Sequence, residues 1–377
     1  MSWSEITIAE LGEIITGKTP PTSAKENYGG SIPFITPSDM VGNRTVTETE
    51  RYISEQGKTT VKNCVLPSHV VCVSCIGSDM GKAIITSQES ITNQQINSII
   101  CKPEYDYRFV YYLMLTLRDT IRSLGKNATA VPILNKSKFS SIHISVPQLS
   151  KQKQIADILS GFDDLIENNQ KQIKLLEEAA QRLYKEWFVD LRFPGHENTP
   201  IVDGVPEGWS LTNINAVMTF HRGYDLTKNS MIPGKYPVIG STSIIGYHNQ
   251  YKIKGPGIVT GRSGSLGEYQ LTWEDYWPHN TALYVSDMKG HHVLYLYSML
   301  QTVDFSGLNN GGAIPTLNRN TLSNIAVIEA TKALQDEYVR IVEPIYSLIK
   351  TAKNQIKYLQ ETRDRLLPKL MNGEIEV

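Results

Sequence analysis

The sequence has few cysteines, no long apolar segment and almost no net charge, and each of these absences narrows the class of protein. Four cysteines in 377 residues are too few for a disulfide framework, which favours a reducing compartment, the cytoplasm. No apolar run approaches the ~20 residues that span a bilayer, and the first residues, Met1 to Glu5, are unlike a secretory signal. The balance of 37 Lys and Arg against 38 Asp and Glu excludes a generally polybasic nucleic-acid coat, but it is compatible with a local basic groove.

Motifs that would indicate catalysis are lacking as well. The eight histidines form no H-E-x-x-H zinc motif, and there is no G-x-S-x-G nucleophile elbow. The N/D-P-P-Y/F loop of adenine methyltransferases, their Gly-rich cofactor strand and the P-D…E-x-K pattern of nucleases are also absent. We therefore expect a chain that is not an enzyme by itself, with no catalytic residues, no metal ligands and no cofactor of its own.

Two short patterns resemble ligand sites but have a simpler explanation. Residues 12–19 fit the phosphate-binding pattern G-x-x-x-x-G-K-[ST], yet Pro20 and Pro21 follow where a helix N-terminus should face the phosphate. ATP hydrolysis at Lys18 is the alternative that this motif leaves open. A zinc site could be drawn with Cys64, His69, Cys72 and Cys75. Their single C-x-x-C lies in an apolar, strand-like run, which favours packing in the core.

Internal similarity organises the whole sequence. Residues 131–188 align with residues 314–371 at an offset of 183, and further matches occur upstream in the same order. The matched segments are Ala130–Asn135 with Ala313–Asn318, Gln181–Leu183 with Asp364–Leu366, Trp3-Ser4 with Trp209-Ser210, Ile32–Ile35 with Tyr236–Ile239, and Gly77–Gly81 with Ser263–Gly267. The sequence therefore predicts a tandem duplication, in which each copy is a globular part followed by a helical part.

Apolar residues in the two helical parts recur at steps of four and three, the pattern of a coiled-coil seam. The predicted seam consists of Ile155, Leu159, Phe162, Ile166, Ile173, Leu176, Leu183, Val342, Ile345, Ile349, Ile356, Leu359, Leu366 and Leu370. About 35 residues at ~1.5 Å each make a helix of about 50 Å. We expect the two helices, within residues 151–192 and 334–377, to form an antiparallel coiled coil, since a lone apolar stripe would lie in water. Packing of each helix on its own globular part is the alternative. Gly161 and Pro344 predict a bend or a late helix start.

Residues 1–150 and 193–333 form the two globular parts, each with strand-like runs and one amphipathic stretch. Strands are expected at 70–76 and 257–260, and helices at 109–117 and 293–300, which gives a mixed α/β or α+β fold. Lys and Arg nearly equal Asp and Glu in every segment; the first 150 residues contain 14 of the former and 13 of the latter. Any DNA binding would therefore depend on a few focused residues or on partner subunits.

Two divergent domains held apart by a rod suit a protein that reads two different DNA half-sites. Polar loop residues in both copies are candidate base readers: Ser78, Lys82, Gln94, Gln95 and Asn127 in the first, and Arg222, Tyr224, Arg262, Ser263, Asn280 and Asn310 in the second. Arg and Lys suit guanine O6 and N7, whereas Asn and Gln suit adenine N6 and N7. For each residue the alternative is ordinary turn chemistry or loop solvation.

Several longer stretches resemble the specificity subunits of type I restriction-modification enzymes, and the resemblance covers essentially the whole chain. The stretches are Leu11–Pro20, Ile32–Asp39, Leu134–Ile155 at the entry to the first long helix, and Leu366–Ile375 at the end of the second. The resemblance implies that each globular part is a target-recognition domain. It also implies that the helices are spacers that dock two modification subunits, which are adenine methyltransferases, and that restriction subunits join this core.

The resemblance further implies the partners and cofactors. Double-stranded DNA is the ligand, and a target adenine would be flipped into the pocket of a modification subunit. S-adenosylmethionine, ATP and Mg²⁺ would belong to the partner subunits, and no membrane is involved. A coiled-coil adaptor that tethers two ligands other than DNA is the alternative function. The lack of a net-basic segment favours this alternative, whereas the full-length resemblance opposes it.

Overall fold

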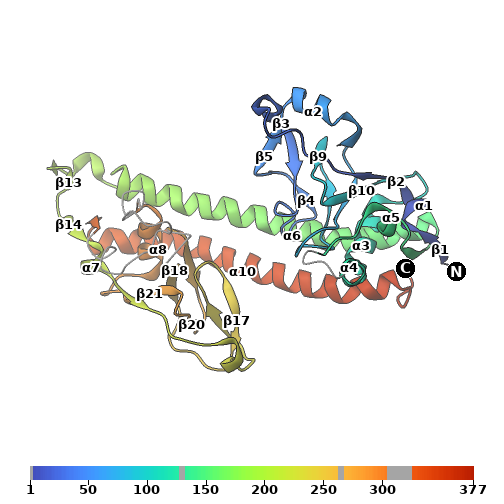
Figure 1. Cartoon of the computed structure of the whole chain (residues 1–377). Helices are drawn as coiled ribbons and strands as arrows, with labels where there is room; N and C mark the ends of the chain where they lie inside the picture. The colour runs from blue at the N-terminus through green and yellow to red at the C-terminus, as the bar shows by residue number, and fades with distance from the viewer. Residues whose placement is uncertain (1–2, 127–131, 262–266, 304–324) are drawn as a thin grey trace. The chain divides into compact units, whose positions relative to one another are not determined.

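The computed structural model of the chain describes residues 3–126, 132–261, 267–303 and 325–377 (Figure 1). It contains two compact units. Unit 1 comprises residues 1–170 and 353–377, and unit 2 comprises residues 171–352. Each unit therefore holds one sheet-rich part together with a portion of each long helix. In the described part of the chain, no helix is both long and apolar enough to cross a membrane.

Unit 1 contains two main sheets and a covering helix. The first sheet has the order β2-β10-β7-β8-β4, with β2 at Gly12–Thr16, β10 at Ile96–Cys101, β7 at Val71–Ser74, β8 at Ala83–Thr86 and β4 at Thr45–Val46. The second has the order β5-β3-β9-β6, with β5 at Arg51–Ile53, β3 at Tyr28–Ile35, β9 at Ser90–Thr92 and β6 at Val65–Leu66. Strand β1 (Ser4–Thr7) pairs with β11 (His143–Val146). Helix α3 (Tyr107–Thr116) begins at Asp106, whose carboxylate accepts hydrogen bonds from two backbone N–H groups of the first turn.

Unit 2 repeats this plan with one strand fewer in each of its two main sheets, as far as the described residues show. Its first sheet has the order β15-β21-β18-β19, with β15 at Thr219–Arg222, β21 at Ala282–Asp287, β18 at Gly257–Gly261 and β19 at Tyr269–Thr272. Its second has the order β17-β16-β20, with β17 at Ile244–His248, β16 at Tyr236–Ile239 and β20 at Trp277–Pro278. Strand β14 (Ser210–Asn213) pairs with β22 (Ala326–Glu329). Helix α8 (Val293–Gln301) begins at His292, which caps it as Asp106 caps α3.

The strand pairings confirm the duplication that the sequence predicts. Strands β3 and β9 pair in parallel, and so do β16 and β20 at the same place in unit 2. The predicted strands and both predicted amphipathic helices are present as β7, β18, α3 and α8. Two of the matched segments fall partly or wholly outside the described residues, namely Ala130–Asn135 with Ala313–Asn318 and Gly77–Gly81 with Ser263–Gly267.

The two long helices are unbroken. Helix α6 spans Leu149–Tyr184 and continues into a π-helical turn at Lys185–Val189, and helix α10 spans Lys332–Met371. The predicted late helix start at Gly161 and Pro344 is wrong, because both residues lie inside these helices. Both positions are exposed, and so is Arg340, whose carbonyl loses the hydrogen bond that Pro344 cannot donate. Water can solvate that carbonyl, which offsets part of the roughly 3 kcal/mol that a proline costs inside a helix.

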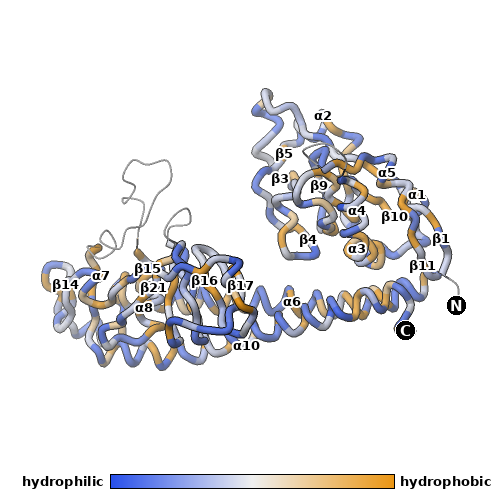
Figure 2. The backbone as a smooth tube through the Cα atoms, turned by 60° about the horizontal axis from the view of Figure 1, so that its bottom comes forward, coloured by the Kyte–Doolittle hydropathy of each residue, from blue (hydrophilic) through white to orange (hydrophobic). Residues whose placement is uncertain are grey.

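Ten of the predicted seam residues belong to, or pack against, the two hydrophobic clusters that both long helices share within each unit. All fourteen are buried or partly buried. In unit 1, Ile155 and Leu159 of α6 share a hydrophobic cluster with Leu370 of α10. In unit 2, Ile173 of α6 packs against the cluster that contains Val342 of α10. The start of α6 thus contacts the end of α10 and the reverse, which is antiparallel packing. Figure 2 shows the apolar positions recurring along both helices.

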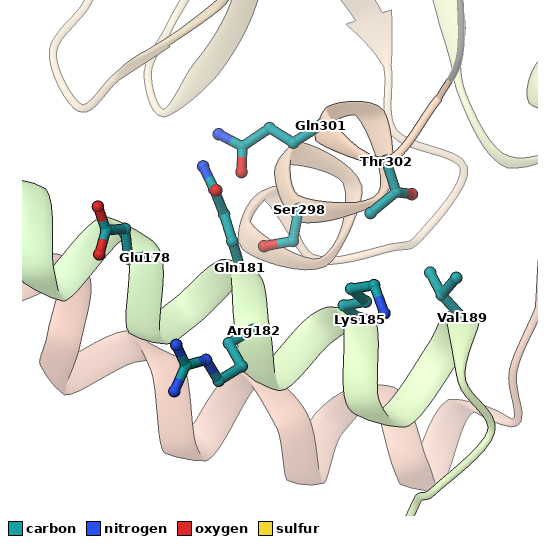
Figure 3. Close-up of a pocket in the computed structure, with 8 residues that line it drawn as sticks. All are labelled: Glu178, Gln181, Arg182, Lys185, Val189, Ser298, Gln301 and Thr302. Atoms are coloured by element: carbon teal, nitrogen blue, oxygen red, sulfur yellow. The ribbon is translucent and has the colours of Figure 1, made fainter.

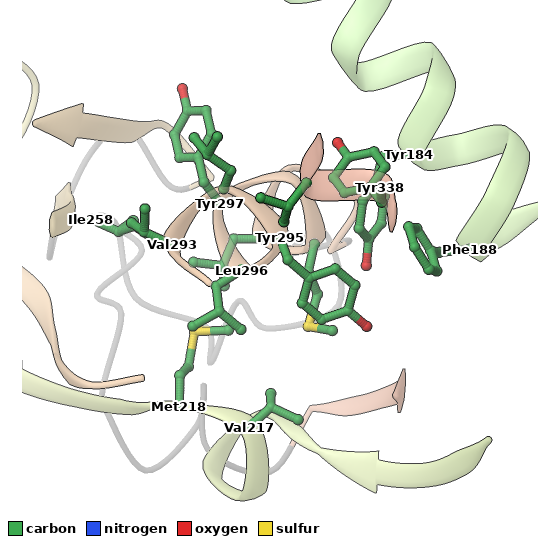
Figure 4. Packing of buried hydrophobic residues seen from close by; sticks show 14 of the residues in the cluster. Tyr184, Phe188, Val217, Met218, Ile258, Val293, Tyr295, Leu296, Tyr297 and Tyr338 are labelled. Carbon is green, nitrogen blue, oxygen red and sulfur yellow. The ribbon is translucent and has the colours of Figure 1, made fainter. Parts of the chain in front are cut away.

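The same clusters contain residues of the sheet-rich parts, so each long helix also packs on a globular part. In unit 1 the cluster includes Phe109 and Tyr112 of α3. In unit 2 it includes Tyr295 of α8, which lies among the aromatic side chains of Phe188 and Tyr338 (Figure 4). Both packing alternatives drawn from the sequence are therefore correct, because the helices contact one another and also contact the globular parts.

Candidate nucleic-acid interface

A tight turn between β9 and β10 places two predicted base readers, Gln94 and Gln95, at one end of unit 1. The Asn93 N–H donates to the Ile35 carbonyl at 3.1 Å, and the Ile96 N–H donates to the Asn93 carbonyl at 3.2 Å. The Asn93 side-chain amide donates to Gln95 Oε1 at 2.8 Å. The turn is therefore held at its base by the end of β3 and from inside by Asn93, which leaves Gln94 exposed.

Three further segments end beside this turn. The hydroxyl of Thr19, in the loop after β2, donates to Gln94 Oε1 at 2.7 Å. The amide nitrogen of Gln95 approaches Gly77 in the loop after β7. Lys82 closes that loop, and its ammonium pairs with Asp79 at 3.1 Å and donates to the Pro37 carbonyl, after β3, at 3.2 Å.

The loop after β7 also borders a pocket of about 480 Å³ in unit 1. Ser78, another predicted base reader, lines this pocket. The structure therefore brings together Ser78, Lys82, Gln94 and Gln95 at one end of unit 1. Asn127 lies outside the described residues.

Unit 2 contains the same turn between β20 and β21. The His279 N–H donates to the Ile239 carbonyl at 2.8 Å, and the Ala282 N–H donates to the His279 carbonyl at 2.9 Å. Arg222, at the end of β15, donates from Nε to the Asn280 carbonyl at 3.3 Å. The Asn280 side-chain amide donates to the Asp225 carboxylate.

Arg222, Tyr224 and Asn280, three of the candidate base readers, therefore meet at this turn. Arg262, Ser263 and Asn310 lie outside the described residues.

One glycine in each unit lets the neighbouring strand approach the turn. Gly17 donates its N–H to the Ile96 carbonyl at 3.1 Å, and Gly223 donates its N–H to the Ala282 carbonyl at 3.0 Å. A Cβ on Gly17 would collide with the backbone oxygen of Asn93, and one on Gly223 would collide with that of His279. The same steric requirement at both positions makes the turn a shared architectural feature of the two units.

We expect Gly17→Ala and Gly223→Ala each to lower the free energy of unfolding by about 1–3 kcal/mol, because the turn must shift to admit a methyl group. Thermal unfolding of the full chain measures this. Gly161→Ala is the control: its added Cβ meets open space in α6, and alanine favours a helix over glycine by about 0.8–1.0 kcal/mol. Equal free energies of unfolding for Gly17→Ala and Gly161→Ala would contradict the close approach of Gly17 to the turn.

Aromatic and cationic side chains lie next to the turn of unit 2. The hydroxyls of Tyr224 and Tyr284 are 3.0 Å apart. The ammonium of Lys252 lies 4.9 Å from the ring centre of Trp277 and 5.7 Å from that of Tyr224. Burial raises the pKa of Tyr284 above its ordinary value, and its hydrogen bond with Tyr224 adds to this, so the Tyr284 hydroxyl is protonated at neutral pH. Tyr224 is thus partly exposed, and its neighbours hold its aromatic ring in place.

The cysteines that could be drawn as a zinc site are core residues. Cys72 and Cys75 belong to two hydrophobic clusters of unit 1. Burial raises the pKa of the Cys72 thiol to about 12 and that of Cys75 to about 11, so both are protonated. His69 stacks on Tyr107, with 4.6 Å between ring centres. Among the described residues, no three His, Cys, Asp or Glu side chains are grouped to hold a metal ion.

Reasoning from the sequence missed several cations at this end of unit 1. Helix α4 (Arg118–Gly125) and its C-cap place Arg118, Arg122 and Lys126 at intervals of four residues. Arg122 Nε donates to the Met80 carbonyl at 3.1 Å, and both Arg122 and Lys126 line the pocket beside Ser78. Their spacing in the sequence is a signal for this cluster, because basic residues at i, i+4 and i+8 share one helix face.

A pocket of about 550 Å³ lies between α6 and α8 of unit 2 (Figure 3). Gln181, Arg182 and Lys185 come from the α6 side, and Gln301 comes from α8. None of the predicted base readers lines it. Ser298, at its floor, accepts a hydrogen bond from the buried Tyr338 hydroxyl, so that part of the lining belongs to the core packing.

Known proteins resemble this chain over its full length. A family model, type I restriction modification DNA specificity domain, matches residues 1–178 and 206–358. The type I restriction enzyme MjaIX specificity subunit of Methanocaldococcus jannaschii is 28% identical over 410 residues, which cover 100% of this chain and 94% of the relative. The HindI specificity subunit of Haemophilus influenzae is 35% identical over 181 residues, covering 46% of this chain and 39% of that protein. The type I S subunit structure from M. genitalium covers 98% of this chain and 96% of its own, with a TM-score of 0.60 and 18% identity, which shows a shared fold.

Proposed function

This chain belongs to the DNA specificity subunits of type I restriction-modification systems, and from this premise we propose that each of its units reads one half of a bipartite DNA site. As a specificity subunit, the chain is the non-catalytic part of a type I enzyme. Residues 1–150 and 193–333 act as the two target-recognition domains, and the long helices between them act as spacers.

The observation that carries this proposal is one turn built twice with different side chains. The turn in unit 1 presents Gln94 and Gln95, whereas the equivalent turn in unit 2 presents Asn280 and Thr281. Its backbone hydrogen bonds are the same in both units, so the difference lies in the groups that a base edge would meet. Amide side chains suit adenine, and Arg222 beside the second turn suits guanine. Two similar scaffolds with different readers favour two half-sites of different sequence.

Repeated exposed apolar residues on the long helices support the docking of two modification subunits. Ile158 of α6 and Ile341 of α10 are exposed and lie 183 residues apart, which is the offset of the duplication. Two further pairs share this offset and exposure, namely Leu165 with Leu348 and Leu175 with Tyr358. Matching apolar positions on both helices suit two copies of the same partner. The adenine methyltransferase partners would supply S-adenosylmethionine, and the restriction subunits would supply ATP and Mg²⁺ chemistry.

Mapping of methylated adenine at base resolution tests the proposal. We expect a bipartite methylated motif in the host genome that disappears when this gene is deleted. Exchange of residues 1–150 for the matching domain of a relative with another motif should change one half of the motif and retain the other. Exchange of residues 193–333 is the reciprocal control and should change only the second half.

An unchanged methylome after deletion would contradict DNA recognition and would support a tether for other ligands. A change in both halves after either exchange would contradict the assignment of one half-site to each domain.

A further inference from the structure

We propose that Lys18 in unit 1 and Lys252 in unit 2 each bind a DNA phosphate beside the half-site of their own unit. The inference rests on the proposed DNA-reading function and names two residues that position the duplex. It also gives a role to the G-x-x-x-x-G-K-T pattern of residues 12–19, which forms strand β2 and the loop after it.

The position of Lys18 is fixed from both sides. Gly17 before it is bonded to Ile96, and the side chain of Thr19 after it is bonded to Gln94. Lys18 is exposed, and its ammonium has no ion pair with another described residue. By contrast, the ammonium of Lys82 is already engaged by Asp79 and a backbone carbonyl. Lys18 therefore offers an uncommitted positive charge immediately beside a predicted base reader.

Lys252 brings a positive charge to the equivalent loop of unit 2. Tyr224 follows Gly223 as Lys18 follows Gly17, and the Lys252 ammonium lies over the Tyr224 and Trp277 rings. Its backbone N–H donates to the Tyr276 carbonyl at 3.0 Å. The aromatic faces attract the cation without supplying acceptor atoms, so its N–H groups remain able to bind an anion. Each unit thus carries one lysine at this loop, although the two come from different segments.

A phosphate is a better ligand for these lysines than a base. Lysine is a compact, strongly hydrated charge on a flexible stem, which suits a phosphate oxygen and has no fixed geometry for reading an edge. Half or more of protein–DNA hydrogen bonds go to the phosphates and sugars, and these contacts set the register of the protein on the duplex. Focused cations of this kind are also what a chain with a net charge of −1 requires.

The test is DNA binding by the full chain assembled with its modification subunits, measured over a range of salt concentrations. The probes are a duplex with the methylated motif and a duplex with that motif scrambled. We expect Lys18→Ala and Lys252→Ala each to weaken binding to both duplexes about fivefold at 0.15 M salt. Each variant should reduce the slope of log K against log salt by about 0.9, and the double variant by about 1.8. The methylated motif should stay the same.

Lys102→Ala and Lys289→Ala are the matched controls. Lys102 lies at the Gly12 end of β2, opposite the Lys18 loop, and Lys289 lies at the Thr219 end of β15, opposite the Tyr224 loop. Both are exposed, and we expect the slope with each variant to equal that of the unmodified chain. Lys18→Arg and Lys252→Arg should restore the slope.

Two results would overturn the phosphate assignment: variant slopes equal to those of the controls, or a change of one base in the methylated motif. Loss of motif preference by the unmodified complex would instead refute the proposed function, so the two failures are distinguishable.

Discussion

Arg363→Met is expected to lower the free energy of unfolding by about 3 kcal/mol, because it leaves a carboxylate buried without its partner. Arg363 of α10 pairs with Asp163 of α6, whose side chain is only 4% exposed. The other carboxylate oxygen accepts a hydrogen bond from the Tyr112 hydroxyl of α3 at 2.5 Å. Helices α3, α6 and α10 of unit 1 therefore meet at the Asp163 carboxylate.

The pKa values of both partners follow from this geometry. Burial opposes the charge on Arg363, but Asp163 and Asp364 together raise its pKa above the ordinary value. Burial also raises the pKa of Tyr112, and the nearby Asp163 carboxylate raises it further, so the Tyr112 hydroxyl donates at neutral pH. Removal of the guanidinium leaves one neutral donor for a buried negative charge, which is an expensive arrangement.

Calorimetry of the full chain measures the effect, which corresponds to a fall of about 6–12 °C in the melting temperature for a unit of this size. Arg365→Met, at an exposed position of the same helix, is the control and should change the free energy of unfolding by less than about 0.5 kcal/mol. Asp163→Asn combined with Arg363→Met should be more stable than Arg363→Met alone, since no charge is left buried. Equal melting temperatures for Arg363→Met and Arg365→Met would refute the buried ion pair.

The Asp163–Arg363 ion pair shows what the sequence does not predict about the long helices, namely which residues of the two helices lie opposite one another. Heptad spacing predicted both helices and placed all fourteen seam residues correctly at buried or partly buried positions. The same spacing left Arg363 as a polar interruption, because periodicity alone does not say which residue of the other helix lies opposite. Its partner is 200 residues away, and only the register of the two helices brings them together.

For the candidate interface, the sequence indicates polar residues in turns but not the contacts between distant segments. Residue type and turn chemistry place Gln94, Gln95, Arg222 and Asn280 among the candidate base readers, since polar side chains in short turns are readily recognised. The pairing of Thr19 with Gln94 depends on strands β2 and β10 lying side by side, a contact between segments 75 residues apart. The motif alone indicates only a nucleotide-binding role for Lys18, because the place of Lys18 beside Gln94 follows from the sheet and not from the motif.

Tyr338→Ala is expected to lower the free energy of unfolding of unit 2 by about 3–5 kcal/mol. Tyr338 of α10 is fully buried. Its ring contacts Tyr184 and Phe188 edge to face, with centres 5.6 Å and 5.3 Å apart. Truncation would leave a cavity where α6, α8 and α10 meet, and packed aromatic neighbours collapse only partly into such a space.

The hydroxyl of Tyr338 contributes separately from the ring. It donates to Ser298 Oγ at 2.8 Å. Burial raises the pKa of Tyr338 above its ordinary value, so this donor keeps its proton throughout the neutral range. Tyr338→Phe retains the ring and loses one hydrogen bond, for which we expect about 0.5–1.5 kcal/mol. Combining Tyr338→Phe with Ser298→Ala should cost less than the sum of the single changes, because the two side chains share one bond.

Chemical denaturation of the full chain, followed by tryptophan fluorescence, reports on this cluster, since Trp187 lies 6.1 Å from Tyr338 between ring centres. Tyr358→Ala, at an exposed position of the same helix, is the matched aromatic control and should leave the denaturation midpoint nearly unchanged. If Tyr338→Ala and Tyr358→Ala had the same midpoint, Tyr338 would not join α10 to the core of unit 2. A midpoint lowered only by Tyr338→Ala would show that the packing of α6, α8 and α10 around Tyr338 holds the sheet-rich part of unit 2 on the long helices.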